Sequence, residues 1–178
     1  AQHFSDEFVF GKYDNFNKLK EFCYKVDIIT YEFENIPYET LQNLNNEKKV
    51  NPCPNINKII QNRLFEKDFI NKCNLRTTKY VHIKNQKDLQ ASDEYVPGLL
   101  KTCTLGYDGK GQYKIENSDQ LSNFEIETDK EYILEKFINL KTEISVVLTR
   151  YGHQKCSIYE PIENKHEAVS YTHLRAHE

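Results

Sequence analysis

Apolar positions in the first 55 residues follow a pattern that predicts an α/β unit. Apolar side chains at helical spacing follow Asn15 or Asn17, either of which could cap a first helix. The mostly apolar, β-branched run 26–31 predicts a strand buried on both faces, and 38–45 predicts a second helix. Two prolines within 50–55 indicate a linker. This order of elements is typical of an open α/β sheet, in which ligands bind at the carboxyl ends of strands.

The pattern beyond the linker predicts a long helix and then a series of short elements. Residues 56–72 carry one apolar stripe, and on such a helix Arg63 and Lys67 share a face. A shared basic face is either solvated or directed at phosphate. The pattern then predicts strands over 75–83, 96–100, 112–115, 132–138, 143–149 and 156–159, and short helices over 85–91 and 118–122.

A glycine-rich loop separates two of these strands and is the first candidate for chemistry. Three of the six glycines of the chain lie within 106–111, and Lys101 ends the entering strand. Glycine permits positive φ and lets backbone N–H groups approach an anion closely. The loop is therefore a phosphate cover or an ordinary hairpin turn, and the residues alone favour neither.

Four carboxylates at strand ends are further candidates, each with a plain structural alternative. Glu32 and Glu34 follow the buried strand 26–31; the pattern slightly favours a ligand-facing role for Glu32 and a solvated loop for Glu34. Glu135 either accepts protons from a ligand or marks the exit of its strand to solvent. Glu143 shares one strand face with Ser145, and that face is either ligand-facing or solvated.

Composition limits the classes of function. With 24 basic and 27 acidic residues among 178, the net charge of −3 gives no nucleic-acid footprint. The five cysteines are scattered and form no CxxC pair or Cys/His cluster along the chain, so we predict no metal site and a reducing, cytoplasmic location. No run is long enough to span a membrane. Because methionine is absent and the chain opens at Ala1, we expect a fragment.

Five ordered motifs carry a family resemblance. They are Asp27-Ile-Ile-Thr-Tyr-Glu-Phe-Glu-Asn-Ile-Pro37, Asn62-Arg-Leu-Phe-Glu-Lys67, Lys101 with Gly106-Tyr-Asp-Gly-Lys-Gly-Gln112, Tyr132-Ile-Leu-Glu-Lys-Phe137 and Glu143-Ile-Ser-Val146. Together they resemble the 5-(carboxyamino)imidazole ribonucleotide synthases, the ATPase subunits of phosphoribosylaminoimidazole carboxylase in the ATP-grasp superfamily. The resemblance runs from the first residues to Glu167.

The resemblance implies ATP-dependent carboxylation of 5-aminoimidazole ribonucleotide with bicarbonate in de novo purine biosynthesis, through carboxyphosphate. It implies small-molecule substrates, no nucleic acid or membrane partner, and a parent that is often a homodimer. The implied residues near the carboxylation centre are Tyr107, Asp108 and Lys110, with Glu32 at the aminoimidazole side. The implied ATP-binding residues are Arg63, Lys101, Gly106, Tyr107, Asp108, Gly109, Lys110, Gly111, Gln112, Glu135, Lys136, Phe137, Ile138, Glu143 and His166. Of these, Arg63 and Lys101 would contact phosphates, the strand from Glu135 would line adenine, and Glu135 would bind the ribose hydroxyls.

The chain departs from this family at several points. Leu105 stands where many relatives have glycine, and residues 168–178 resemble the translation of a sequencing adapter, so His173 and His177 do not indicate a metal site. The expected Mg²⁺ ligands would lie beyond the end of this chain. We therefore expect this chain alone to be catalytically inactive, because a site without Mg²⁺ ligands cannot neutralise the transferring phosphate.

The sequence thus predicts an α/β protein that is truncated at both ends. Residues 1–52 would be the C-terminal part of a Rossmann-like pre-ATP-grasp domain, 53–167 the N-terminal, lid-bearing part of an ATP-grasp domain, and 168–178 a non-native tail. Two alternatives remain. One is another ATP-grasp carboxylate–amine ligase, such as the formate-dependent glycinamide ribonucleotide enzyme, and the other is a nucleotide-binding module without turnover.

Overall fold

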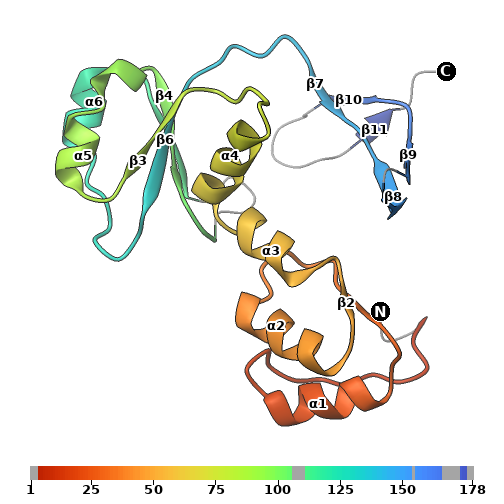
Figure 1. Cartoon of the computed structure of the whole chain (residues 1–178). Coiled ribbons are helices and arrows are strands. Elements are labelled where there is room, and N and C mark those ends of the chain that lie inside the picture. Colours follow the sequence, from red (N-terminus) through yellow and green to blue (C-terminus); the bar gives the residue numbers. More distant parts are fainter. Residues whose placement is uncertain (1–3, 106–110, 154, 166–172, 176–178) are drawn as a thin grey trace.

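The computed structural model describes residues 4–105, 111–153, 155–165 and 173–175 (Figure 1). Its first unit is a short β-α-β arrangement. Strand β1 (Ile29–Thr30) pairs in parallel with β2 (Val50–Asn51), and α2 (Tyr38–Glu47) connects them. Helix α1 (Phe16–Tyr24) begins after Asn15, whose side chain accepts a hydrogen bond from the N–H of Lys18. The two predicted helices are confirmed, and the predicted strand is present but shorter. The prediction that this strand is buried on both faces is wrong, because Ile29 is buried whereas Ile28 and Thr30 are exposed.

A small apolar core holds this first unit together. It is built from the buried residues Cys23, Ile29, Ile36, Leu41, Leu44 and Val50. The segment interpreted as a linker belongs partly to this unit, because β2 occupies its first two residues and contributes Val50 to the core. A two-residue parallel strand has no apolar alternation to reveal it in the sequence.

The single long helix predicted over 56–72 is wrong. Two helices, α3 (Pro54–Ile60) and α4 (Arg63–Lys72), stand in its place. Asn62 causes the break: its backbone is extended, and its side chain accepts hydrogen bonds from the N–H groups of Leu64 and Phe65. Asparagine is a favourable N-cap residue, so one helix can end and another begin at this point at little cost in stability. The apolar stripe continues through the break, so the hydrophobic spacing does not reveal it.

The second unit is a four-stranded antiparallel sheet in the order β3-β6-β4-β5. Its strands are β3 (Tyr80–Ile83), β4 (Gly98–Thr102), β5 (Gln112–Ile115) and β6 (Tyr132–Lys136). Helices α5 (Gln86–Gln90) and α6 (Ser118–Asn123) cover one face, and α4 lies on the other (Figure 1). A 3-10 turn, η2 (Asp93–Tyr95), precedes β4. The core between sheet and helices contains Ile83, Leu89, Leu100, Ile115, Leu121, Tyr132 and Leu134.

The remaining strands form two further small sheets. Strand β7 (Glu143–Ser145) pairs with β10 (Ile162–Lys165), which also pairs with β11 (His173–Arg175), whereas β8 (Leu148–Gly152) pairs with β9 (Lys155–Ile158). The single strand predicted over 143–149 is therefore wrong. It changes partner at Val146 and Val147, and a continuous β-branched run does not mark such a change.

The observed architecture confirms the predicted α/β class. Within the described part of the chain, no helix combines the length and the apolar character that crossing a membrane requires.

Candidate functional site

One face of the four-stranded sheet carries the polar residues of the candidate site. Side chains alternate along a strand, so Leu100, Tyr132 and Leu134 enter the core under α5 and α6, while their neighbours point toward α4. The side chains on the α4 face are Tyr80 and His82 from β3, Lys101 from β4, and Ile133 and Glu135 from β6.

Glu135 lies between two lysines in the centre of this face. Its Oε2 is 2.9 Å from Nζ of Lys101, and its Oε1 is 3.2 Å from Nζ of Lys67 on α4. The Glu135 side chain is 9% exposed and the lysine side chains 16–18%, so water screens these ion pairs weakly. Lys67 also lies 5.7 Å from the ring centroid of Tyr80. The hydroxyl of Tyr80 donates to Asp68 at 2.7 Å, which fixes the ring under the lysine.

Arg63 adds a third cation beside this cluster. Its backbone N–H donates to the carbonyl of Cys103, and its guanidinium Nη1 donates to the carbonyl of Thr102, both at 2.9 Å. The end of β4 therefore holds the start of α4. Three cations (Arg63, Lys67 and Lys101) and two carboxylates (Glu135 and Asp68) leave an excess of one positive charge at this face, which favours an anionic ligand.

Backbone groups at the start of α4 do not add to this anion site. The N–H groups of Leu64 and Phe65 donate to the side chain of Asn62, and that of Glu66 donates to its carbonyl. Since the first-turn donors already have partners, the side-chain cations must supply the attraction for an anion.

The end of β6 offers backbone rather than side-chain groups. The N–H of Lys136 donates to the carbonyl of Lys79, and the N–H of Phe137 donates to that of Pro97. The Lys136 side chain points away to the carbonyls of Glu94 and Val96. Among the described residues, no backbone hydrogen bond engages the N–H of Ile138, whose side chain is half exposed.

Glu143 lies in the separate sheet of β7 and β10 (Figure 1). Asn164, its cross-strand partner on β10, donates from Nδ2 to Oε1 of Glu143 at 2.9 Å and also contacts Ser145. This contact fixes the orientation of the Glu143 carboxylate. The contribution of Asn164 was not predicted, because it depends on a strand pairing 21 residues away.

The structure covers the glycine-rich loop only in part. Gly106, Tyr107, Asp108, Gly109, Lys110 and His166 lie outside the described residues, and their predicted roles stay predictions. Gly111 has φ +68°, and a Cβ there would lie 2.6 Å from Oγ1 of Thr102, so glycine is required. Gln112 begins β5 opposite Lys101. Leu105 adopts φ +59°, a conformation that a branched side chain disfavours.

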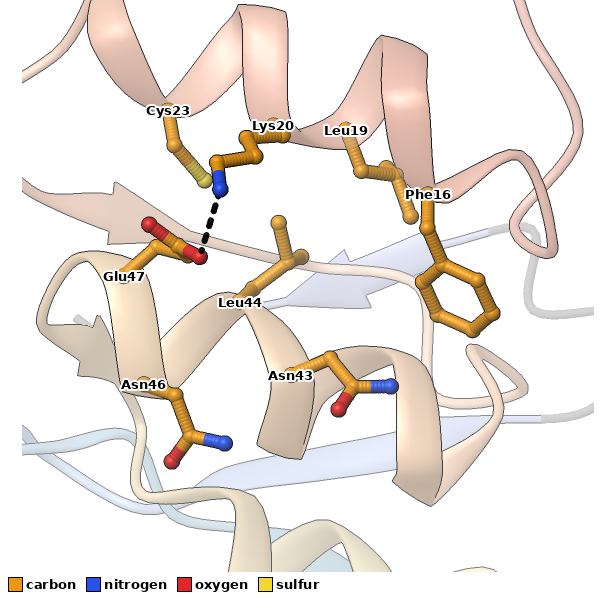
Figure 2. A pocket seen from close by; sticks show the side chains of 8 residues that line it. All are labelled: Phe16, Leu19, Lys20, Cys23, Asn43, Leu44, Asn46 and Glu47. Atoms are coloured by element: carbon orange, nitrogen blue, oxygen red, sulfur yellow. Dashed lines mark ion pairs between the residues drawn. The ribbon is translucent and has the colours of Figure 1, made fainter.

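Glu32 is exposed on the loop after β1, and its predicted ligand-facing role stays a prediction. Figure 2 shows a different feature of the same unit, a pocket of about 370 Å³ between α1 and α2. Lys20 and Glu47 form an ion pair of 3.6 Å at its edge, and burial together with Glu47 raises the pKa of the Cys23 thiol. None of the predicted site residues lines this pocket.

Comparison with known families gives two adjacent matches. Residues 1–61 match the ribonucleotide synthetase preATP-grasp domain, and residues 68–177 match the ATP-grasp domain. These matches are ranges of similarity, and the boundary expected after residue 52 stays a prediction.

Individual relatives agree with the family matches. The N5-carboxyaminoimidazole ribonucleotide synthase of Staphylococcus aureus (strain COL) is 31% identical over 169 residues, which cover 93% of this chain and 45% of the relative. The bifunctional purine synthesis protein purC/E of Dictyostelium discoideum is 32% identical over 93% of this chain and 17% of the relative. The crystal structure of the Staphylococcus aureus N5-carboxyaminoimidazole synthetase complexed with ADP superposes with a TM-score of 0.82 at 28% identity, over 93% of this chain and 45% of that one. The chain thus spans less than half the length of these relatives.

Proposed function

Because the chain belongs to the ATP-grasp family and is homologous to the N5-carboxyaminoimidazole ribonucleotide synthases, we propose that it binds ATP for the carboxylation of 5-aminoimidazole ribonucleotide with bicarbonate. The observation that carries the proposal is the cluster of Lys67, Glu135 and Lys101 on one sheet face, with Arg63 beside it. The reaction consumes ATP and yields ADP and phosphate.

The cations act on the phosphates. Phosphoryl transfer depends mainly on positioning and on neutralising charge, and lysine and arginine supply both. Glu135 contacts Lys101 and Lys67 with one carboxylate oxygen each, so it holds their two ammonium groups at a fixed spacing. The excess positive charge then falls on the ligand.

The end of β6 is suited to adenine and Glu143 to ribose. The N–H of Ile138, which makes no backbone hydrogen bond to another described residue, can donate to a ring nitrogen, whereas the N–H groups of Lys136 and Phe137 already donate to backbone carbonyls. Glu135 already contacts two lysines, so we assign the ribose hydroxyls to Glu143, whose carboxylate Asn164 orients. This assignment replaces Glu135 at the ribose by Glu143.

The glycine-rich segment and Glu32 belong to the acceptor chemistry. Carboxyphosphate hydrolyses in water, so the segment from Gly106 to Gln112 serves as a cover over it, with Tyr107, Asp108 and Lys110 at the reacting carbon. Glu32, in the loop that follows β1, would accept a hydrogen bond from the aminoimidazole ribonucleotide.

Magnesium, which the family uses with ATP, does not fit the donors found here. Among the residues that the structure describes, the group of side chains close enough to hold a metal is His82, Cys103 and Glu131. Mg²⁺ requires oxygen ligands, and this set has a sulfur and an imidazole nitrogen. A cytoplasmic location, consistent with five unpaired cysteines, and a homodimer are parts of the same proposal.

Nucleotide binding can be tested by calorimetric titration of this chain with ATP and ADP. Lys101→Met and Lys67→Met are each expected to weaken binding at least about tenfold, because a hydrogen bond to a charged phosphate contributes about 1.5–3 kcal/mol. Lys87→Met is the matched control, since Lys87 is exposed on α5 at the opposite face of the sheet. Equal affinity in all three variants would refute the phosphate site.

The substrate assignment needs a separate measurement. In a protein that carries this chain together with the remaining length of its relatives, ADP release is expected to require both bicarbonate and 5-aminoimidazole ribonucleotide. Formate with glycinamide ribonucleotide is measured in parallel. Turnover with formate would replace the substrates while leaving the ATP site in place.

A further inference from the structure

Three metal-ligating side chains meet at one end of the four-stranded sheet. His82 lies on β3, Cys103 directly follows β4, and Glu131 directly precedes β6. In the sheet, β6 lies between β3 and β4. Their ligand atoms all lie within 4.8 Å of one another. The N–H of Cys103 donates to the carbonyl of Glu131 at 2.8 Å, which fixes these two residues side by side. They come from positions 82, 103 and 131, so spacing along the chain does not reveal the group.

One polar atom of this group is incompletely satisfied without a ligand. Nε2 of His82 is buried and, within the described residues, makes no hydrogen bond, although it lies 3.3 Å from Oε2 of Glu131. Cys103 is 2% exposed. Buried polar atoms normally have hydrogen-bond partners, so a buried ring nitrogen whose contacts are a carboxylate and a nearby thiol needs an explanation.

A divalent cation supplies that explanation. Imidazole nitrogen, thiolate sulfur and carboxylate oxygen are the ligands that zinc prefers, at bond lengths of about 2.0–2.3 Å. Tetrahedral geometry then places ligand atoms roughly 3.3–3.7 Å apart, and the His82–Glu131 contact of 3.3 Å already has that separation. Since all three ligand atoms lie within 4.8 Å of one another, small side-chain rotations bring the sulfur of Cys103 to the separation that a shared cation requires.

We propose that His82, Cys103 and Glu131 bind one zinc-class divalent cation, with a fourth position open to water. On binding, the Sγ–H bond of Cys103 breaks, its proton goes to solvent, and a sulfur–metal bond forms. The cation joins the ends of β3, β4 and β6. It also lies beside the carbonyls of Thr102 and Cys103 that hold Arg63, so it stabilises the sheet end next to the nucleotide site.

Cobalt titration of this chain in a non-thiol reductant tests the site, because a thiolate bound to Co²⁺ gives a charge-transfer absorption band that histidine-only sites lack. One equivalent of Co²⁺ is expected to produce the band, and Zn²⁺ is expected to remove it. Cys103→Ser is expected to abolish it, and Cys73→Ser, an exposed cysteine, is the matched control that leaves it unchanged. No band, or a band that survives in Cys103→Ser, would overturn the proposal.

A second variant covers the case in which Cys103→Ser fails to fold. The Glu131 side chain is 58% exposed, so Glu131→Gln leaves the core intact. It is expected to keep the band but to weaken Co²⁺ binding at least about tenfold. About tenfold is the lower limit of the loss in metal affinity that follows when residues around the metal ligands are changed. Zn²⁺ is also expected to raise the melting temperature of the unmutated chain and to raise that of Glu131→Gln less. Identical cobalt affinity in the two would exclude Glu131 from the site and overturn the three-residue assignment.

Discussion

Replacing Glu135 by glutamine removes one charge from the centre of the sheet face at constant volume. At an effective dielectric constant of about 20, each contact to Lys67 or Lys101 is a gross attraction of about 5–6 kcal/mol. Desolvation of the three groups and repulsion between the lysines offset most of it. Removing one partner of a buried ion pair costs about 3–5 kcal/mol, because the other charge stays buried and unpaired. Since both lysines keep some exposure, we expect a loss near the lower end, about 3 kcal/mol.

Urea unfolding measures this loss, with hydrogen exchange of the peptides that cover β4 and β6 as the readout for this sheet. For a slope of about 2 kcal/mol per molar, the midpoint is expected to fall by about 1.5 M. Glu116→Gln is the control. Its carboxylate lies 2.7 Å from Nζ of Lys114, closer than either contact of Glu135, but both side chains are more than half exposed. Its loss is expected to leave the midpoint unchanged, because solvent screens the pair.

The two variants separate burial from distance. If contact distance determined the stabilisation, Glu116→Gln would have the larger effect. Equal midpoints for Glu135→Gln and Glu116→Gln would refute the reasoning that Glu135 is a buried carboxylate shared by two charged lysines.

Three further changes test other parts of the structure. Gly111→Ala is expected to speed hydrogen exchange in β4 and β5, because its Cβ would lie 2.6 Å from Oγ1 of Thr102 at a φ of +68°; adding Thr102→Ala would restore only the steric part, and unchanged exchange in the single variant would contradict the description. Leu105→Gly is expected to stabilise the chain in thermal unfolding by up to about 1 kcal/mol, since glycine adopts a φ of +59° without strain; a lower melting temperature would contradict this. At pH 8 with a chelator present, peptide mass spectrometry is expected to show iodoacetamide on three cysteines and not on Cys23 or Cys103, because burial raises the pKa of both thiols. With a pKa of about 11, about one Cys103 thiol in a thousand is ionised at pH 8, and its reactivity appears only as the pH approaches 11. Rapid labelling of Cys103 at pH 8 would contradict its burial. The reactive thiols are the exposed Cys53, Cys73 and Cys156.

Local signals in the sequence predicted much of the fold. Asn15 was expected to cap the first helix and does so, and the apolar runs that contain Leu100 and Leu134 were expected to be strands and lie in the central sheet. The break at Asn62 was missed, because the same apolar stripe continues on both sides of it.

Contacts between distant residues were not available from the sequence. The sequence identified Lys101 and Glu135 as candidates, but their ion pair depends on the pairing of β4 with β6. Lys67 contacts the same carboxylate across 68 positions of the chain, from a helix face whose spacing of basic residues more often indicates a solvated surface. His82 and Cys103 also come together through strand pairing, because β6 pairs with β3 on one side and with β4 on the other.

The short joint between α3 and α4 contacts two parts of the chain. On one side, Gln61 donates from Nε2 to the carbonyls of Glu34 and Ile36, in the loop that carries Glu32. On the other, Arg63 donates to the carbonyls at the end of β4. A ligand that shifts β4 therefore changes the free energy of arranging the loop, and reciprocity requires the converse. Cooperativity between two small molecules bound at these places would then reside in residues 61–63, without any contact between the molecules themselves.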